Sequence, residues 1–146
     1  MSETWIILGA TSSMARAMTR RLAEDGHRLL LTGRDMEDLA ATAADARARG
    51  SKAVETFSVD MRDTESFGPL IEAAKRYDGS LNTAVFVGSM PAQADIDADP
   101  SLIDGVIRDS FIGPAEILQR LAPEMEARKS GTVVGVGSVA GDRGRV

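Results

Sequence analysis

Short apolar runs alternate with longer amphipathic segments along the whole chain of 146 residues. Runs such as Arg28–Thr32 are continuously apolar, as is typical of parallel strands that are covered on both faces. In other segments apolar residues recur at the spacing of a helix, as Phe67, Leu70 and Ile71 do. The pattern predicts strands at about Thr4–Leu8, Arg28–Thr32, Ala53–Val59, Leu81–Gly88 and Thr132–Gly137. It predicts helices from Ser12 or Ser13 to about Asp25, from a cap at Asp35 to Arg49, from Asp63 or Thr64 to about Gly79, and from Ser101 to about Lys129.

Two stretches interrupt this regular alternation. Residues Ser89 to Pro100 are polar and rich in Asp, and we expect them to form the longest irregular loop. Pro114 lies within the long C-terminal helical pattern and has no N–H to donate, which predicts a kink or a break after Gly113.

Strands that are joined by long helices imply right-handed parallel crossovers. We therefore expect an α/β fold, a doubly wound parallel sheet of the Rossmann type with about five strands in the order 3-2-1-4-5. No linker or repeat divides the sequence, so residues 1–146 are expected to form a single domain. In such sheets ligands bind at the carboxyl ends of the strands, where the strand order reverses.

The segment from Leu8 to Ala15 has the pattern of a strand, a tight loop and the start of a helix. Unpaired N–H groups and the helix dipole make such a helix start a site for a phosphate or pyrophosphate. Gly9 permits the sharp turn, whereas Ser13 and Ala15 stand where the dinucleotide fingerprint has its second and third glycines. A plain turn between strand and helix is the alternative. The candidate cofactor-binding residues of this loop are Gly9, Thr11, Ser12, Ser13 and Met14.

Further candidates lie at the other strand ends. Arg34 stands where an NAD enzyme usually has an acidic residue, and its guanidinium suits a 2′-phosphate, so NADP is favoured over NAD. Arg34 could also be a solvated charge that opens the next helix. Asp60 could accept a hydrogen bond from an adenine amino group or cap the following helix, and Gly88 could lie against a nicotinamide ribose or simply form a turn. The candidate cofactor-binding residues at these ends are Gly33, Arg34, Asp60, Met61, Val87 and Gly88.

The composition excludes several classes of function. A net charge of −5 and a pI near 4.9 argue against binding to nucleic acid or to an anionic membrane. No apolar run is long enough to span a membrane, and the first residues lack the pattern of a signal peptide. The absence of cysteine excludes disulfides and thiolate metal sites and fits a cytoplasmic protein. The single histidine, His27, precedes a strand, and we expect a solvated turn residue there and no metal site.

Taken together, these motifs resemble the N-terminal portion of a short-chain dehydrogenase/reductase. The segments that carry the resemblance are the glycine loop, Gly33–Arg34, Val59–Asp60, Val87–Gly88, Phe111–Gly113 and Gly131–Gly141. The resemblance implies hydride transfer between a nicotinamide cofactor and a small carbonyl or alcohol substrate. In the family the serine directly before an x-Ala-Gly sequence is catalytic, and Ser138 holds that place. Its hydroxyl would stabilise a developing oxyanion, while a tyrosine and a lysine manage the proton.

The sequence also departs from the family's pattern. Of the family's Asn-Asn-Ala-Gly only Gly88 remains, and Ser110 replaces the active-site asparagine of the long helix. The catalytic tyrosine and lysine would lie beyond Val146, because the single tyrosine, Tyr77, falls on an apolar helical stripe and is expected in the core. We therefore expect the cofactor-binding portion of a reductase that is inactive by itself. A regulatory nucleotide-binding module and a component of a dinucleotide-dependent epimerase are the alternatives.

The family resemblance also predicts how the chain assembles. In the family a later helix packs against the long helix of a partner subunit. We therefore expect the apolar face of Leu102–Met125 to be incompletely covered and the protein to be a homo-oligomer.

Overall fold

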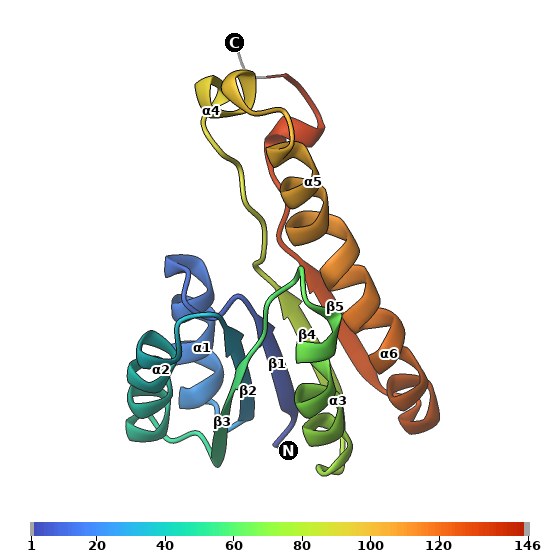
Figure 1. Cartoon of the computed structure of the whole chain (residues 1–146). Helices are drawn as coiled ribbons and strands as arrows, with labels where there is room; N and C mark the ends of the chain where they lie inside the picture. The colour runs from blue at the N-terminus through green and yellow to red at the C-terminus, as the bar shows by residue number, and fades with distance from the viewer. Residues whose placement is uncertain (1, 145–146) are drawn as a thin grey trace.

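A five-stranded parallel sheet forms the centre of the computed structural model, which describes residues 2–144 (Figure 1). The strands lie in the order β3-β2-β1-β4-β5, and each neighbouring pair is parallel. This confirms the predicted fold class and strand order. The strands are β1 (Thr4–Leu8), β2 (Arg28–Gly33), β3 (Ala53–Ser58), β4 (Leu81–Val85) and β5 (Gly131–Gly135).

Helices cover both faces of this sheet. Helices α1 and α2 lie on one face, and α3 and α6 lie on the other (Figure 1). The helical segments are α1 (Ser13–Glu24), α2 (Met36–Ala48), η1 (Thr64–Phe67), α3 (Gly68–Lys75), α4 (Gln93–Ala98), α5 (Leu102–Ile107), η2 (Arg108–Ile112), α6 (Gly113–Arg128) and η3 (Val139–Gly141).

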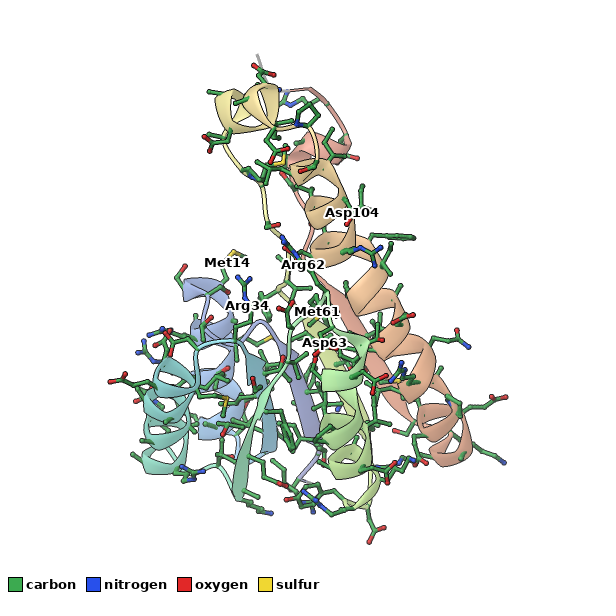
Figure 2. All side chains as sticks on the ribbon, in the orientation of Figure 1. Met14, Arg34, Met61, Arg62, Asp63 and Asp104 are labelled. Carbon is green, nitrogen blue, oxygen red and sulfur yellow. The ribbon has the colours of Figure 1, made fainter. Side chains whose placement is uncertain are left out.

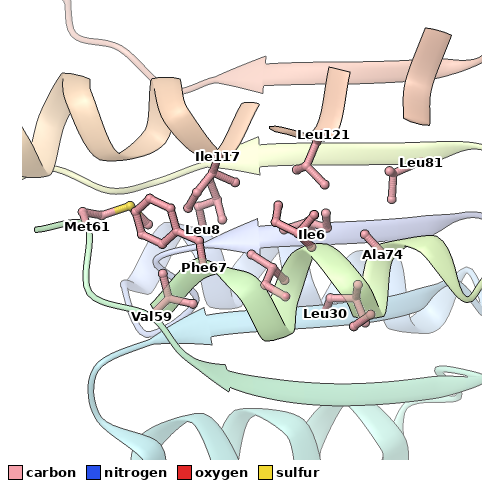
Figure 3. Packing of buried hydrophobic residues seen from close by; sticks show 13 residues of the cluster. Ile6, Leu8, Leu30, Val59, Met61, Phe67, Ala74, Leu81, Ile117 and Leu121 are labelled. Carbon is pink, nitrogen blue, oxygen red and sulfur yellow. The ribbon is translucent and has the colours of Figure 1, made fainter. Parts of the chain in front are cut away.

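The apolar core is divided between the two faces of the sheet. Successive side chains of a strand point to opposite faces, so Ile6 of β1 packs towards α3 and α6, whereas Ile7 packs towards α1 and α2. Figure 3 shows the first of these clusters, in which Phe67, Ile117 and Leu121 of the covering helices meet the strands. Because β1 and β2 are buried on both faces, they carry no polar alternation in the sequence.

Side-chain caps fix the starts of the first two helices. The Oγ of Ser12 accepts a hydrogen bond from the N–H of Ala15, 3.2 Å away, and so α1 begins at Ser13. Asp35 accepts from the N–H of Asp38 at 3.0 Å, as expected from the sequence. The first cap places the positive end of α1 directly behind the loop that follows β1.

The long helical pattern after Ser101 differs from the expectation. It breaks neither at Gly113 nor at Pro114, and passes instead through the π-helical turn η2 between α5 and α6. The N–H of Gly113 donates to the carbonyl of Arg108, five residues earlier, and Pro114 occupies the first turn of α6. Because the π-turn ends where α6 begins, Pro114 lies in the first turn of α6, where its missing N–H does not interrupt the helix.

One predicted loop and the predicted ends of three elements also differ from the structure. The expected loop Ser89–Pro100 contains the short helix α4, and β4 and β5 end at Val85 and Gly135, before the glycines that were expected to close them. The helix expected from Asp63 to about Gly79 begins with the 3-10 turn η1, and α3 ends at Lys75. Tyr77 therefore follows the helix, although its ring still packs half-buried against the core.

Candidate functional site

A cleft opens at the carboxyl ends of the strands, beside the point where the strand order reverses between β2 and β4 around β1. Its walls come from the end of β2 and the loops that follow β1, β2, β3 and β4, together with one residue of η2. Nine of the predicted cofactor-binding residues line it: Gly9, Thr11, Ser12, Gly33, Arg34, Asp60, Met61, Val87 and Gly88. Five further residues that were not predicted from the sequence also line it: Thr32, Val59, Phe86, Ser89 and Asp109.

The loop after β1 approaches the loop after β4 as closely as backbone allows. Gly9 has a φ of +78°, and a Cβ there would lie 3.1 Å from Cγ1 of Val87 and 3.2 Å from the carbonyl carbon of Phe86. Only glycine relieves both the backbone strain and the contact. The bare backbone of Gly9 therefore forms part of the cleft wall in front of the start of α1.

Two residues of this loop lie differently from the expectation. Ser13 is the first residue of α1, and Met14 follows it with 60% of its surface exposed. Neither lines the cleft. Ser12 does line it, although its Oγ is already engaged as the helix cap. The serine that stands in place of the second fingerprint glycine thus does not fill the cleft.

Arg34 extends from the end of β2 at the opposite side of the cleft. Its neighbour Gly33 packs against Thr11, because a Cβ on Gly33 would lie 3.4 Å from Cγ2 of that residue. Within residues 2–144 no carboxylate lies within ion-pair distance of Arg34, and its side chain is exposed. By contrast, Arg16 is already bound to Asp38. Arg34 is thus a cation in the cleft that can bind an anionic ligand.

The turn after β3 uses its two aspartates differently. Asp63 caps η1 by accepting from the N–H of Glu65 at 3.1 Å, so the capping role considered for Asp60 belongs to Asp63. Asp60 accepts from the N–H of Arg62 at 2.9 Å and keeps its place in the cleft wall. Met61 is buried and packs with Phe67, so it links the cleft to the core (Figure 3).

A network of charged and polar side chains forms the wall on the side of the long helix. Nε and Nη2 of Arg62 donate to the two carboxylate oxygens of Asp109 at 2.9 and 2.6 Å, and Oγ of Ser89 donates to Oδ2 of Asp109 at 2.8 Å. The Arg62 guanidinium holds the pKa of Asp109 below its usual range, against the opposing effect of burial. One signal for this network was present in the sequence: Asp109 interrupts the apolar stripe that includes Val106 and Gly113.

The two predicted catalytic serines have different hydrogen-bond partners in the described structure. Oγ of Ser110 accepts from the N–H of Ser89 at 3.4 Å and lies beside Gly88, at the edge of the cleft. Ser138 follows β5, where its exposed Oγ accepts from the N–H of Ala140 at 3.2 Å as the cap of η3. No hydrogen bond within residues 2–144 joins the two serines, and neither lines the cleft.

The remaining candidates for proton chemistry lie at the opposite edge of the sheet. The guanidinium of Arg28, the first residue of β2, stacks on the Tyr77 ring, and the Tyr77 hydroxyl donates to Glu55 at 2.7 Å. This hydrogen bond and burial raise the pKa of Tyr77. His27 accepts from the N–H of Glu3 at 3.1 Å at the same edge. Neither residue reaches the cleft.

Residues 2–144 contain no cluster of three or more side chains that could ligate a metal ion. None of their helices is long and apolar enough to cross a bilayer.

A doubly wound parallel sheet with a glycine turn before its first helix and a ligand cleft at the β1 switch point is the Rossmann type of NAD(P)-binding fold. Comparison with known proteins agrees. The sequence profile described as short chain dehydrogenase matches residues 3–146, and the chain belongs to this family.

Relatives and solved structures match almost the whole chain. The sequence is 32% identical to an uncharacterized oxidoreductase of Mycobacterium tuberculosis, over 96% of this chain and 56% of that protein. It is 35% identical to sulfoacetaldehyde reductase 2 of Chromohalobacter salexigens, over 97% of this chain and 56% of the relative. A variant of actinorhodin polyketide ketoreductase, solved with NADPH, superposes with a TM-score of 0.85 at 27% identity and covers 99% of this chain and 56% of its own. The chain thus spans about half the length of the proteins it matches.

Proposed function

We propose that this chain is the cofactor-binding portion of an NADP-dependent oxidoreductase that transfers hydride between nicotinamide and a carbonyl or alcohol substrate. The observation that carries the proposal is Arg34, an arginine without a carboxylate partner in the described structure, directly after β2 and facing the cleft. A guanidinium can bind a phosphate through two parallel hydrogen bonds. An acidic residue for an unphosphorylated ribose does not occupy this place.

The residues that line the cleft follow one another in the same order as the parts of a dinucleotide that they would bind. Gly9 and the start of α1 offer bare backbone and a positive dipole end to the diphosphate. Arg34 lies at the end for the adenosine ribose, and Asp60 offers a carboxylate oxygen to the base. Gly88 lies on the other side of Gly9, where the nicotinamide ribose would lie. A bound nicotinamide ring supplies the hydride acceptor or donor.

We assign Ser138 and Ser110 to the part of the site where the nicotinamide and the substrate would react. Ser138 follows β5, and Ser110 of η2 accepts a hydrogen bond from the N–H of Ser89, the residue after Gly88. A hydroxyl at Ser138 can donate a hydrogen bond to an oxygen that gains charge, but it cannot by itself deliver a proton at neutral pH. Since Tyr77 is held at the opposite edge of the sheet, we expect the isolated chain to bind cofactor without catalysing turnover.

Similar proteins support the substrate class. The relative from Chromohalobacter salexigens is a sulfoacetaldehyde reductase, and the superposed structure is a polyketide ketoreductase. Both names denote reduction of a carbonyl group. We therefore propose that the substrate carries a carbonyl or alcohol group. We also expect the protein to be cytoplasmic.

Titration of the chain with NADPH and with NADH, followed by the fluorescence of the reduced nicotinamide, tests the proposal. Arg34→Ala should weaken NADPH binding by about tenfold or more, because it removes a charge-assisted hydrogen-bond pair, and should leave NADH binding nearly unchanged. Arg21→Ala is the matched control, since Arg21 is an exposed arginine on α1 that does not line the cleft. Equal affinity of the unmodified chain for both dinucleotides would contradict the choice of NADP.

A further inference from the structure

The wall of the cleft on the side of the long helix carries the Asp109 carboxylate, whose charge is already neutralised by Arg62. Only 11% of the Asp109 side chain is exposed, and it lines the same cleft as Arg34. Its two oxygens receive the fork of Arg62 and the hydroxyl of Ser89. A buried, ionised carboxylate needs such partners, because its own desolvation is costly.

The geometry around Arg62 is built to hold this fork in place. The backbone N–H of Arg62 is held by Asp60, and its guanidinium lies against Gly105 of α5. A Cβ on Gly105 would lie 2.7 Å from Nη2 of Arg62 and 2.8 Å from its Cζ, so a larger residue there would displace the guanidinium. The Arg62 guanidinium therefore reaches Asp109 over the bare backbone of Gly105. It binds the carboxylate with two hydrogen bonds, which is the strongest geometry for an arginine and a carboxylate.

Arg34 is the other cation near this carboxylate. The pKa of Asp109 is lowered chiefly by the hydrogen bonds from Arg62, then by that from Ser89, and least by the charge of Arg34. Figure 2 shows Arg34 and Arg62 at the same edge of the sheet. If Arg62 were absent, Asp109 would lose its bidentate partner, whereas Arg34 would still line the cleft with it.

We propose that Arg62 is a specificity-determining positioning residue: by occupying Asp109, it leaves Arg34 free to bind the 2′-phosphate. This inference rests on the proposed NADP function. Arg62 acts through Asp109 and Arg34 and does not itself touch the cofactor. The pair thus prevents a competing ion pair inside the cleft.

The proposal predicts that substituting the two partners of this ion pair has unequal effects on NADPH affinity. Arg62→Met leaves Asp109 charged and without an arginine partner, so Asp109 competes for Arg34 and NADPH affinity falls by about tenfold, while NADH affinity changes less than about threefold. Asp109→Asn removes the competing charge, so NADPH affinity stays within about threefold of the unmodified chain. The double variant Arg62→Met with Asp109→Asn should restore the original ratio of NADPH to NADH affinity.

A purely structural role would give a different result, because both single variants break the same contact and would then weaken binding alike. The titrations are run on the full chain, with circular dichroism melts to confirm folding. Arg21→Met and Asp25→Asn form the control pair, since these residues make an exposed ion pair at the end of α1 and neither of them lines the cleft. Should Arg62→Met fail to fold, Asp109→Asn still decides: a tenfold loss of NADPH affinity in that variant overturns the inference.

A crystal structure of Arg62→Met separates this inference from the proposed function. We expect the Arg34 guanidinium within 4 Å of the Asp109 carboxylate in that variant. An Arg34 that keeps its position overturns the inference, whatever the cofactor. If the unmodified chain binds neither dinucleotide while Arg34 moves in the variant, the proposed function fails and the competition between the two arginines is supported.

Discussion

The contact between Gly113 and Met61 gives the sharpest test of how the long helix is attached to the cleft. An ideal Cβ on Gly113 would lie 2.5 Å from the carbonyl oxygen of Met61, and 2.7 and 2.9 Å from its Cβ and Cα. These atoms belong to the backbone of the turn that carries Asp60, or lie directly on it, so they cannot rotate away. Gly113→Ala must therefore push the helix and the turn apart.

The expected size of the effect follows from two opposing terms. Overpacking of a buried contact costs about 1–3 kcal/mol, and a contact with rigid backbone belongs at the upper end. Alanine in a helical position returns up to about 1 kcal/mol relative to glycine. We expect a net loss of about 2 kcal/mol in the free energy of unfolding, which for a chain of this size lowers the melting temperature by about 4–8 °C.

Gly68→Ala is the matched control for this prediction. Gly68 also begins a helix and has helical backbone angles, but no described heavy atom lies within 4 Å of its Cβ position outside its immediate neighbours. This substitution should stabilise the protein by up to about 1 kcal/mol. Both melts are followed by circular dichroism at 222 nm, a helix signal. A Gly113→Ala variant that melts at or above the temperature of the unmodified chain would refute the packing argument.

Two further predictions concern charge and the exposed helix face. Because the folded-state pKa of Asp109 is depressed, its contribution to stability is present above its unfolded pKa of about 3.9 and is lost as the pH falls through the folded value. The stability difference between the unmodified chain and Asp109→Asn should thus shrink as urea melts are moved from pH 6 towards pH 3, and a constant difference would count against the ion pair. Ile103, Ile107 and Phe111 are exposed, Phe111 by 69%, so light scattering should show association that grows with concentration and that Phe111→Ser weakens. A monomer at all concentrations would argue against this face as an interface.

Local sequence patterns were sufficient for most of the fold. Apolar runs such as that of β2 mark strands buried on both faces, and helical spacing with capping residues such as Asp35 marks the helices. Parallel crossovers then leave few possible strand orders. The same reasoning placed Gly9 and Arg34 at strand ends, because the position of a residue relative to its own strand is a local property.

Tertiary packing decided the features that depend on two distant segments. Arg62 and Asp109 lie 47 residues apart, and their meeting depends on the rotation of the long helix about its axis, which the π-turn η2 alters. The same turn, rather than a kink at Pro114, accommodates the proline that has no N–H. The close approach of Met61 then requires glycine at position 113. The sequence by itself therefore determined which elements form and in what order they pair, since these follow from local periodicity. Only the packed structure decided which side chains share the cleft, because that depends on the angles and distances between elements.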